Sequence, residues 1–428
     1  MSRRSPAARR WSRRQFLGGA AGLCAAACAR RDEPLRFWAM GREGEVAQKL
    51  LAGFEAENPG LRVKVEQLPW TAAHEKLLTA FAGDATPDVA QVGNTWLPEL
   101  VALEALEPLD DRVRGAGLDL ADYERGILET NLLEGRQHGV PWYVDTRVLF
   151  YRQDLLAEAG FAAPPRDWDE WTRMMLAVKR RVGQERYAVL LPLNEFEPMV
   201  ALWLQQGDEL LRDGGRRGNF RGPGFRRTLD FYLSLYDRKL APPVTHNEIA
   251  NVWNEFGRGY FSFYISGPWQ IGEFKRRLPP ELQGSWMTAP LPGPAGPGAS
   301  IAGGSSLALF RRSRRKVEAW RMVEYLSRPA VQREFYRLTG NLPARRSAWD
   351  DPGLAADPHA RAFREQLTRV RPVPQVPEWE RIATDLRLVM EKVVRGDIPR
   401  ESAAEDLDRR ADRILEKRRW LLDRRARR

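Results

Sequence analysis

The sequence contains only two cysteines in 428 residues, and both lie within its first 28 positions. Almost the whole chain therefore has no thiol for a disulfide, and its folded part depends on an apolar core. Histidine is also scarce. The four histidines are far apart and show no spacing typical of a metal site; they are His74, His138, His246 and His359. We therefore expect neither a bound metal nor another cofactor.

Motifs of common enzyme classes are absent as well. The sequence has no Gly-x-Ser-x-Gly, and its glycine-rich stretches at 214–215 and 292–298 lack the lysine of a phosphate-binding loop. We therefore expect a protein that is not an enzyme. The paired carboxylates of a glycoside hydrolase come together only in the fold. A secreted carbohydrate-active hydrolase thus remains an alternative from another functional class.

The apolar run near the N-terminus is shorter than the roughly 20 residues that a membrane-spanning helix needs. It is rich in glycine and alanine and closely follows Arg13 and Arg14. This arrangement is typical of a removable twin-arginine export signal, which we place at residues 1–27. The small residues before Cys28 resemble a lipobox, in which the cysteine is acylated; cleavage as an ordinary secretory peptide is the alternative. We expect a protein in the periplasm or on the outer face of the cytoplasmic membrane, with residues 28–33 as a linker.

The formal net charge of +11 is distributed unevenly along the chain. Residues 1–27 contain six arginines and no acidic residue, and their removal leaves +5. The stretch 416–428 contains seven basic and two acidic residues, so the body between the two ends is close to neutral. Nucleic-acid binding needs a basic surface, and we therefore do not expect it. We expect the basic tail at 421–428 to be a solvated end, with contact to anionic lipid headgroups as the alternative.

Strands and helices alternate in the first part of the mature chain. Alternating or continuous apolar residues predict strands at 35–38, 61–66 and 88–92, with amphipathic helices between them. This order predicts an α/β fold with a largely parallel sheet. Ligands of such sheets lie at the carboxyl ends of the strands. In this sequence the strand ends are 38–43, 67–70 and 93–96.

Five stretches in order resemble one family. They are Thr86-Pro87-Asp88-Val89 through Trp96, Gly139 through Leu156, Pro164 through Trp171, Phe263-Tyr264-Ile265-Ser266-Gly267-Pro268-Trp269, and Gly303-Gly304-Ser305-Ser306-Leu307-Ala308. Together they resemble the extracellular solute-binding proteins of ABC importers, in the maltose and multiple-sugar-binding group. The resemblance implies a type II-like periplasmic-binding-protein fold with two α/β lobes, each a mixed, mostly parallel sheet flanked by helices.

The resemblance also implies a discontinuous composition for each lobe and a function. It places the N-terminal lobe at 34–144 plus 268–327 and the C-terminal lobe at 145–267 plus 328–420, with three chain crossings between them. The implied function is capture of a sugar or oligosaccharide by lobe closure and delivery to the membrane permease subunits, by a monomer. A sensory protein that presents its ligand to a receptor would share this fold and site.

Tryptophan is abundant, with 15 residues. An aromatic ring can stack on the C–H face of a sugar, while carboxylates and amides bind its hydroxyls. The resemblance implies stacking roles for Trp269 and Trp379, which we expect to contact ligand rather than core. Three further candidates with possible packing roles are Trp70, Trp96 and Trp253. We expect core or structural positions for Trp168, Trp171, Trp320 and Trp420, the last in one amphipathic helix with Leu407, Ala411, Ile414 and Leu421.

Polar candidates complete the expected site. Asp145 lies at the first lobe crossing, where relatives use an acidic residue to accept hydrogen bonds from hydroxyls. The other candidates are Tyr143 beside it, Glu43, Asn94 and Thr95 at strand ends, the pair Gly303 and Gly304, and, in the second lobe, Glu195 and Glu197. Binding of a glycerol phosphodiester or sugar phosphate is the alternative, for which Arg42, Arg147 and Arg381 are the candidate cations.

Overall fold

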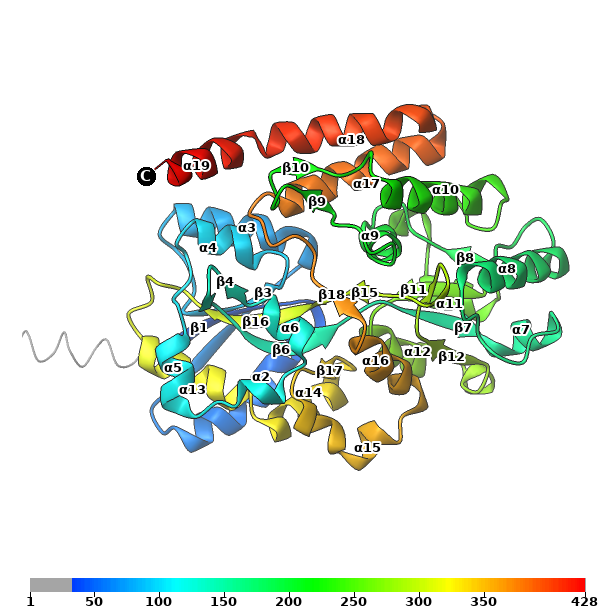
Figure 1. Cartoon of the computed structure of the whole chain (residues 1–428). Helices are drawn as coiled ribbons and strands as arrows, with labels where there is room; N and C mark the ends of the chain where they lie inside the picture. The colour runs from blue at the N-terminus through cyan, green and yellow to red at the C-terminus, as the bar shows by residue number, and fades with distance from the viewer. Residues whose placement is uncertain (1–32, 428) are drawn as a thin grey trace, which may run out of the picture.

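The computed structural model describes residues 33–427. The expected export signal at 1–27, with Arg13 and Arg14, and the expected acylation site Cys28 lie outside these residues. Within them, no helix combines the length and apolarity needed to cross a bilayer. The described chain forms two α/β lobes side by side (Figure 1), which confirms the predicted two-lobed α/β fold with mixed sheets. The expectation that each sheet is mostly parallel is wrong, because antiparallel pairings outnumber parallel ones in both sheets.

The first lobe is built on a six-stranded sheet. Its strands are β1 (Leu35–Met40), β2 (Val63–Leu68), β3 (Val89–Gly93), β6 (Val140–Asp145), β16 (Gly303–Leu309) and β17 (Leu342–Pro343). Their order is β17-β6-β16-β3-β1-β2. β1 pairs in parallel with β2 and β3, and β16 pairs antiparallel with β3 and β6. The first three predicted strands and their parallel arrangement are thus confirmed.

Helices cover both faces of this sheet. They are α2 (Gly41–Glu57), α3 (Trp70–Ala82), α4 (Leu97–Ala102), α5 (Asp110–Ala116), α6 (Arg125–Glu129), α13 (Lys316–Leu326) and α14 (Pro329–Thr339). Successive side chains of a strand point to opposite faces. Phe37 accordingly packs in one core with α2, α13 and α14, whereas Trp38 packs in another with α3 and α4. Because both faces are covered, β1 is apolar almost throughout.

The second lobe is built on a smaller sheet with the order β12-β7-β11-β8. These strands are β7 (Val148–Arg152), β8 (Val189–Leu190), β11 (Phe263–Ser266) and β12 (Trp286–Ala289). The helices around it are α7 (Gln153–Glu158), α8 (Trp168–Val182), α9 (Glu197–Leu204), α10 (Pro223–Asp237), α11 (Val252–Gly257), α12 (Trp269–Arg277) and α16 (Pro358–Leu367). Leu149 of β7 packs toward α8 and α9, and Phe150 packs toward α12 and α16. Trp168 and Trp171 are buried in this core, as predicted.

Short elements connect and extend the two lobes. The two-residue strands are β4 (Leu132–Leu133), β5 (Arg136–Gln137), β9 (Leu211–Arg212), β10 (Arg217–Gly218), β13 (Pro292–Gly293), β14 (Gly296–Pro297), β15 (Ser300–Ile301) and β18 (Val370–Arg371). The short helices are η1 (Leu120–Asp122), η2 (His246–Glu248), η3 (Pro280–Leu282), η4 (Arg346–Asp350) and α15 (Pro352–Ala355).

Asp357 caps α16, and its side chain also accepts hydrogen bonds from Lys275 at 2.7 Å and from the Tyr336 hydroxyl at 2.6 Å.

Sheet membership differs from the expected lobe boundaries in two places. The chain leaves the first sheet after β6 and enters the second at β7, as expected for the crossing at 145. However, β12 pairs with β7 in the second sheet, so 268–289 belongs to the second lobe and the return crossing lies just before β16. β17 pairs with β6 in the first sheet, so the expected change of lobe at 328 is wrong as well. Apolar periodicity locates a strand but does not identify the edge on which it pairs.

Three helices end the chain: α17 (Trp379–Arg395), α18 (Arg400–Ile414) and α19 (Glu416–Ala426). Figure 1 shows them passing along one side of both lobes. Leu407 and Ala411 of α18 are buried, as expected. Trp420 and Leu421 are not, with exposed fractions of 57% and 43%. The expected single amphipathic helix is therefore wrong, because α18 ends at Ile414 and a separate helix carries Trp420.

Candidate functional site

A cleft of about 650 Å³ lies between the lobes and is lined by residues of both. This volume is in the range of small-molecule sites. The cleft brings together eleven of the twelve predicted ligand-binding residues: Glu43, Trp70, Asn94, Thr95, Trp96, Tyr143, Asp145, Trp253, Trp269, Gly303 and Gly304. Residues from strand ends more than 200 positions apart in the sequence therefore meet in one place.

The exception is Trp379. Its side chain is 1% exposed and packs in the core of the second lobe, so the expectation of ligand contact is wrong. Trp379 is the first residue of α17, and the next residue, Glu380, lines the cleft instead. Consecutive helical residues point about 100° apart. The sequence locates the start of this helix, but the rotation of the helix decides which residue faces ligand.

Glu43 is a buried carboxylate fixed by several donors. It is 6% exposed and lies in the first turn of α2, directly after β1. The Asn341 amide donates to its Oε1 at 2.8 Å, and the Tyr143 hydroxyl and Trp70 indole lie within hydrogen-bonding reach. Burial raises the pKa of Glu43, and these hydrogen bonds partly oppose the rise. A carboxylate has about four lone-pair positions, so the held group still has acceptor capacity for a ligand.

A buried polar chain holds Tyr143 in place behind Glu43. The Gln91 amide and the Ser305 hydroxyl both donate to the Tyr143 hydroxyl, at 3.1 Å each. The Gln91 side-chain oxygen in turn accepts from the Met40 backbone N–H at 2.8 Å. Because both groups donate to its oxygen, the Tyr143 hydroxyl keeps its own proton for an acceptor such as Glu43, which lies within reach. These hydrogen bonds connect four strands of the first sheet, β1, β3, β6 and β16, behind one acceptor in the cleft.

Asp145 is part of an ion network at the crossing between the lobes. One terminal nitrogen of Arg147 lies 2.8 Å from each Asp145 carboxylate oxygen, and the other lies 3.1 Å from Glu197 of α9. Burial lowers the pKa of Arg147, but the neighbouring carboxylates raise it by more. Arg147 therefore remains charged, and its charge is neutralised by groups of the protein itself.

Trp269 lies on the second-lobe side of the cleft and is half-buried. The Arg147 guanidinium lies 4.8 Å from its ring centroid. A Cβ atom on Gly267 would lie only 1.9 Å from the indole, so glycine is required for the ring to rest on this backbone. The position of Trp269 is thus fixed by a glycine two residues earlier.

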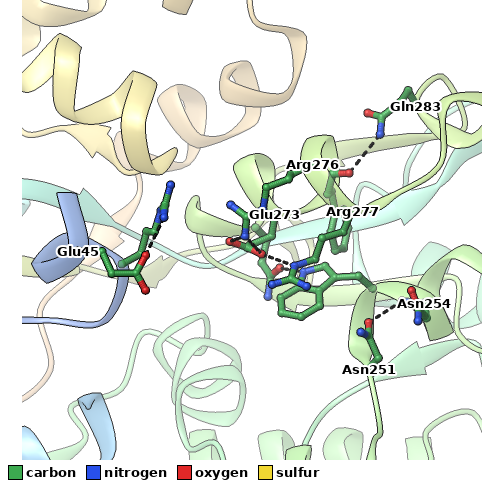
Figure 2. A network of polar contacts seen from close by, with 11 residues as sticks. Glu45, Asn251, Asn254, Glu273, Arg276, Arg277 and Gln283 are labelled. Carbon is green, nitrogen blue, oxygen red and sulfur yellow. Dashed lines mark hydrogen bonds and ion pairs between the residues drawn. The ribbon is translucent and has the colours of Figure 1, made fainter. Parts of the chain in front are cut away.

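Trp253 lies on α11, on the same side of the cleft. Its indole N–H donates to Gln270 at 2.8 Å, and the Arg277 guanidinium lies 4.1 Å from its ring centroid. Figure 2 shows Arg277 turned toward Glu273, to which its Nε donates at 2.6 Å. The helix that carries Trp253 is capped by Asn251, whose side chain accepts from the Asn254 N–H at 2.9 Å (Figure 2).

Two further tryptophans form a wall on the first lobe. The ring centroids of Trp70 and Trp96 are 5.6 Å apart in an edge-to-face arrangement, and His74 lies 5.1 Å from Trp96. Trp96 is 9% exposed, whereas Trp70 is 39% exposed. Their neighbour Thr95 lies within hydrogen-bonding reach of Glu380 from the second lobe. Burial raises the pKa of Glu380.

Gly303 and Gly304 line the cleft and also allow close packing between neighbouring strands. Gly304 has φ +117°, and a Cβ atom there would lie 2.4 Å from the Tyr143 carbonyl oxygen. The carbonyl of Gly303 accepts from the Asn94 amide at 3.2 Å, and the Asn94 oxygen accepts from Ser306 at 2.9 Å. Asn94 is therefore largely occupied by the protein and positions this edge of the cleft.

The sequence and the fold of this chain match a known family. Residues 39–333 match the model of the bacterial extracellular solute-binding proteins. The chain belongs to this family.

Individual relatives agree with this assignment. The structure of the sugar-binding protein MalE from Xanthomonas citri is 54% identical, with a TM-score of 0.86 over 91% of this chain and 99% of that one. The diacetylchitobiose binding protein DasA of Streptomyces coelicolor is 24% identical over 87% of this chain and 87% of its own length. UgpB from Mycobacterium tuberculosis, solved with glycerophosphocholine, has the same fold, with a TM-score of 0.76 and 22% identity over 90% and 99% of the two chains.

Carboxylates outnumber cations in the cleft of this solute-binding protein. Six acidic residues line it, namely Glu43, Asp145, Glu195, Glu197, Glu273 and Glu380, and three arginines, Arg42, Arg147 and Arg277. Each arginine is paired: Arg42 with Glu45, Arg147 with Asp145 and Glu197, and Arg277 with Glu273. Within residues 33–427, no group of three or more Asp, Glu, His or Cys side chains is arranged to hold a metal ion.

Sequence reasoning missed several lining residues of the solute-binding protein. They are Phe196, Glu273, Arg277, Ile301, Thr339, Asn341 and Glu380. Asn341 follows the glycine that ends α14, and Glu380 follows a tryptophan singled out for its position. Both stand beside recognisable helix ends, which is the only local signal that the sequence gives for them.

Proposed function

We propose that this solute-binding protein captures a neutral sugar or oligosaccharide in the cleft and delivers it to the permease of an ABC importer. The observation that carries the proposal is the convergence of two residue types from two lobes. The cleft is lined by Trp70 and Trp96 of the first lobe and by Trp253 and Trp269 of the second, together with fixed carboxylates such as Glu43. Ring faces bind the C–H face of a pyranose, and carboxylates accept its hydroxyl hydrogens.

Lobe closure follows from the division of these contacts. A ligand that touches Glu43 on the first lobe and Trp269 on the second makes both contacts only when the lobes are close together. It therefore binds the closed form more tightly and shifts the equilibrium toward it by that difference in affinity. The closed form is the one that docks on the permease. Function as a monomer completes the proposal.

A phosphorylated ligand fits this cleft less well than a neutral one. A phosphate group needs unpaired cations or free backbone amides. The arginines of the cleft are all in ion pairs with carboxylates, and the expected third cation, Arg381, is not among the lining residues. The excess of carboxylates also repels an anion. We therefore favour the sugar over a glycerol phosphodiester or a sugar phosphate.

A screen of purified protein by thermal shift tests this choice. Mono-, di- and trisaccharides are compared with polyol phosphates, because a ligand that binds only the folded state raises the melting temperature. We expect a rise with at least one neutral sugar and none with the phosphates. A rise with phosphates alone would contradict the proposal.

The absence of catalysis is part of the proposal and has its own test. The sugar that raises the melting temperature is incubated with the protein, and the mixture is analysed by chromatography. We expect the sugar to be recovered intact. Release of a hydrolysis product would support the alternative of a carbohydrate-active hydrolase, with two of the six cleft carboxylates as acid and nucleophile or base.

We further propose that the protein is exported by the twin-arginine pathway and anchored by a lipid on Cys28. Metabolic labelling with palmitate tests the anchor. Label should be incorporated into the wild type and lost in Cys28→Ser, whereas a soluble, unlabelled wild type would indicate an ordinary signal peptide. Replacing both Arg13 and Arg14 by lysine should block export in a cell-fractionation assay.

A further inference from the structure

The exposed tryptophan of the C-terminal helix has no role in the core or in the cleft. Trp420 on α19 is 57% exposed, and the adjacent Leu421 is 43% exposed. Trp70 is the other exposed tryptophan within residues 33–427, and it lines the cleft. Exposed large apolar side chains on a strongly basic helix indicate a surface that meets something else.

One side of α19 is fixed to the second lobe. The Arg418 Nε donates to the Gly215 carbonyl at 3.1 Å, and Arg419 donates to the Arg216 carbonyl at 3.0 Å. Asp423 accepts from the Arg216 side chain at 2.5 Å. These bonds attach the helix to the loop between β9 and β10. They also use Asp423, one of its two acidic residues; the other, Glu416, is exposed at the first position of the helix, one turn before Trp420.

The opposite side of α19 presents a compact set of four side chains. Lys417, Trp420, Leu421 and Arg424 have the spacing i, i+3, i+4 and i+7, which places them on one helix face. All four are exposed. The Arg424 guanidinium lies 5.3 Å from the Trp420 ring centroid. We call these four residues the α19 face; it contains no acidic residue.

We propose that the α19 face docks on the surface of a bilayer that contains anionic phospholipid. Lysine and arginine are attracted to acidic headgroups, and an indole ring prefers the interface between headgroups and acyl chains. A helix with both features lies in the plane of the interface. The contact would hold the protein along its C-terminal helices, at a place separate from the cleft, and does not depend on which ligand the cleft takes.

The lipid surface is favoured over other partners by charge and residue type. The α19 face combines two basic side chains with one exposed aromatic ring, which suits an anionic headgroup surface. Each basic side chain near such a surface changes binding roughly fivefold. Two charge reversals are therefore expected to weaken binding at least about 25-fold.

Vesicle co-sedimentation tests the proposal. The protein is the chain from residue 29 onward, which lacks the signal and Cys28 and keeps every described element. The probe is a vesicle of phosphatidylcholine and phosphatidylglycerol at a ratio of about two to one, with pure phosphatidylcholine for comparison. The variants are K417E/R424E, which reverses the charges, and W420A/L421A, which removes the apolar contact. The matched control is R173E/R180E on α8, with the same charge change at the same spacing on exposed positions.

The outcomes separate the possibilities. We expect wild type and the α8 control to sediment with the anionic vesicles only. K417E/R424E should bind at least about 25-fold more weakly, and W420A/L421A at least about tenfold more weakly. Equal weakening by the α8 control would mean that net charge alone is sensed and would overturn the proposal. The proposal would also be overturned if W420A/L421A bound the vesicles as tightly as the wild type does and the wild type bound heparin equally well. Sugar binding should be unchanged in all variants, so a failure here leaves the proposed function untouched.

Discussion

The affinity of the cleft for its sugar should depend on a glycine that never touches the ligand. Gly267 supports the Trp269 ring, and a Cβ atom there would lie 1.9 Å from the indole. Ordinary carbon contacts are about 3.5–4.0 Å, so Gly267→Ala should displace the ring by about 1.5 Å or more. The backbone at Gly267 lies outside the left-handed region, so alanine adds no backbone strain there. The substitution thus moves one ring and leaves the fold in place.

The expected magnitude follows from the area that the ring offers. If roughly 60 Å² of the half-buried indole is covered by ligand, burial contributes about 1.5 kcal/mol at about 25 cal/mol per Å². The geometry of a ring contact adds up to about 1 kcal/mol. Trp269→Ala should therefore weaken binding by roughly ten- to a hundredfold, and Gly267→Ala should reproduce much of that loss.

Isothermal titration calorimetry on the two single variants and the double variant decides the question. In the Trp269→Ala background, Gly267→Ala should have no further effect, because there is no ring left to displace. Thermal denaturation of each variant controls for folding. Wild-type affinity in Trp269→Ala would refute the stacking model. Additive losses in the double variant would refute the argument that the glycine acts through the ring.

Three further outcomes are expected. Trp379→Ala should lower the free energy of unfolding by about 3–5 kcal/mol in thermal denaturation and leave the affinity of the folded protein unchanged; reduced affinity at unchanged stability would put the ring in the site. Glu43→Gln should weaken sugar binding about tenfold in calorimetry. Because burial raises the pKa of Glu43, its carboxylate is protonated at a pH above the usual 4.5. The affinity of the wild type should therefore begin to fall above pH 4.5 as the pH decreases, and the affinity of Glu43→Gln should not change over this range. Asp357 has a pKa well below its usual 3.8, since hydrogen bonds outweigh its burial. Asp357→Asn should therefore cost about 2–3 kcal/mol in urea denaturation at neutral pH, and the difference should shrink as the pH falls below 3.8; a constant difference would refute the role of the charge.

The predictability of this molecule differs between its strands and its helices. β1 and β3 were located to within two residues, because strand periodicity and the turn at Thr86-Pro87 are local signals. The ends of such strands meet at one edge of the sheet, so Glu43 and Asn94 were found without knowledge of the fold. The resemblance to a family supplied the opposite wall, including Trp269.

The failures share a physical cause. Whether Trp379 or Glu380 faces the ligand depends on the rotation of α17 against its neighbours, which is a tertiary property. Trp420 follows the apolar period of α18, but the helix stops before it, so its ring is left on the surface. The lobe boundary at 268 failed because the pairing partner of β12 is a strand about 140 positions earlier. Helix rotation, the end of α18 and the pairing partner of β12 all depend on distant parts of the chain, so none of them can be predicted from a short stretch of sequence.

The contact between Ser300 and Arg147 has a mechanical consequence. The Ser300 hydroxyl donates to the Arg147 carbonyl at 2.8 Å and accepts from the Arg147 N–H at 3.1 Å. Residues 145–148 and 299–303 run from one sheet to the other, and β18 pairs with the second of them. A third connection leaves the first sheet after β17 and reaches α16 on the second lobe. Tethered segments bend together but resist twisting about each other. We therefore expect the lobes to close mainly about one axis, so that the two walls of the cleft meet in the same register at each closure. When closure is confined to one axis, little orientational entropy is lost on reaching the closed state. More of the free energy of the ligand contacts is then available to distinguish one solute from another.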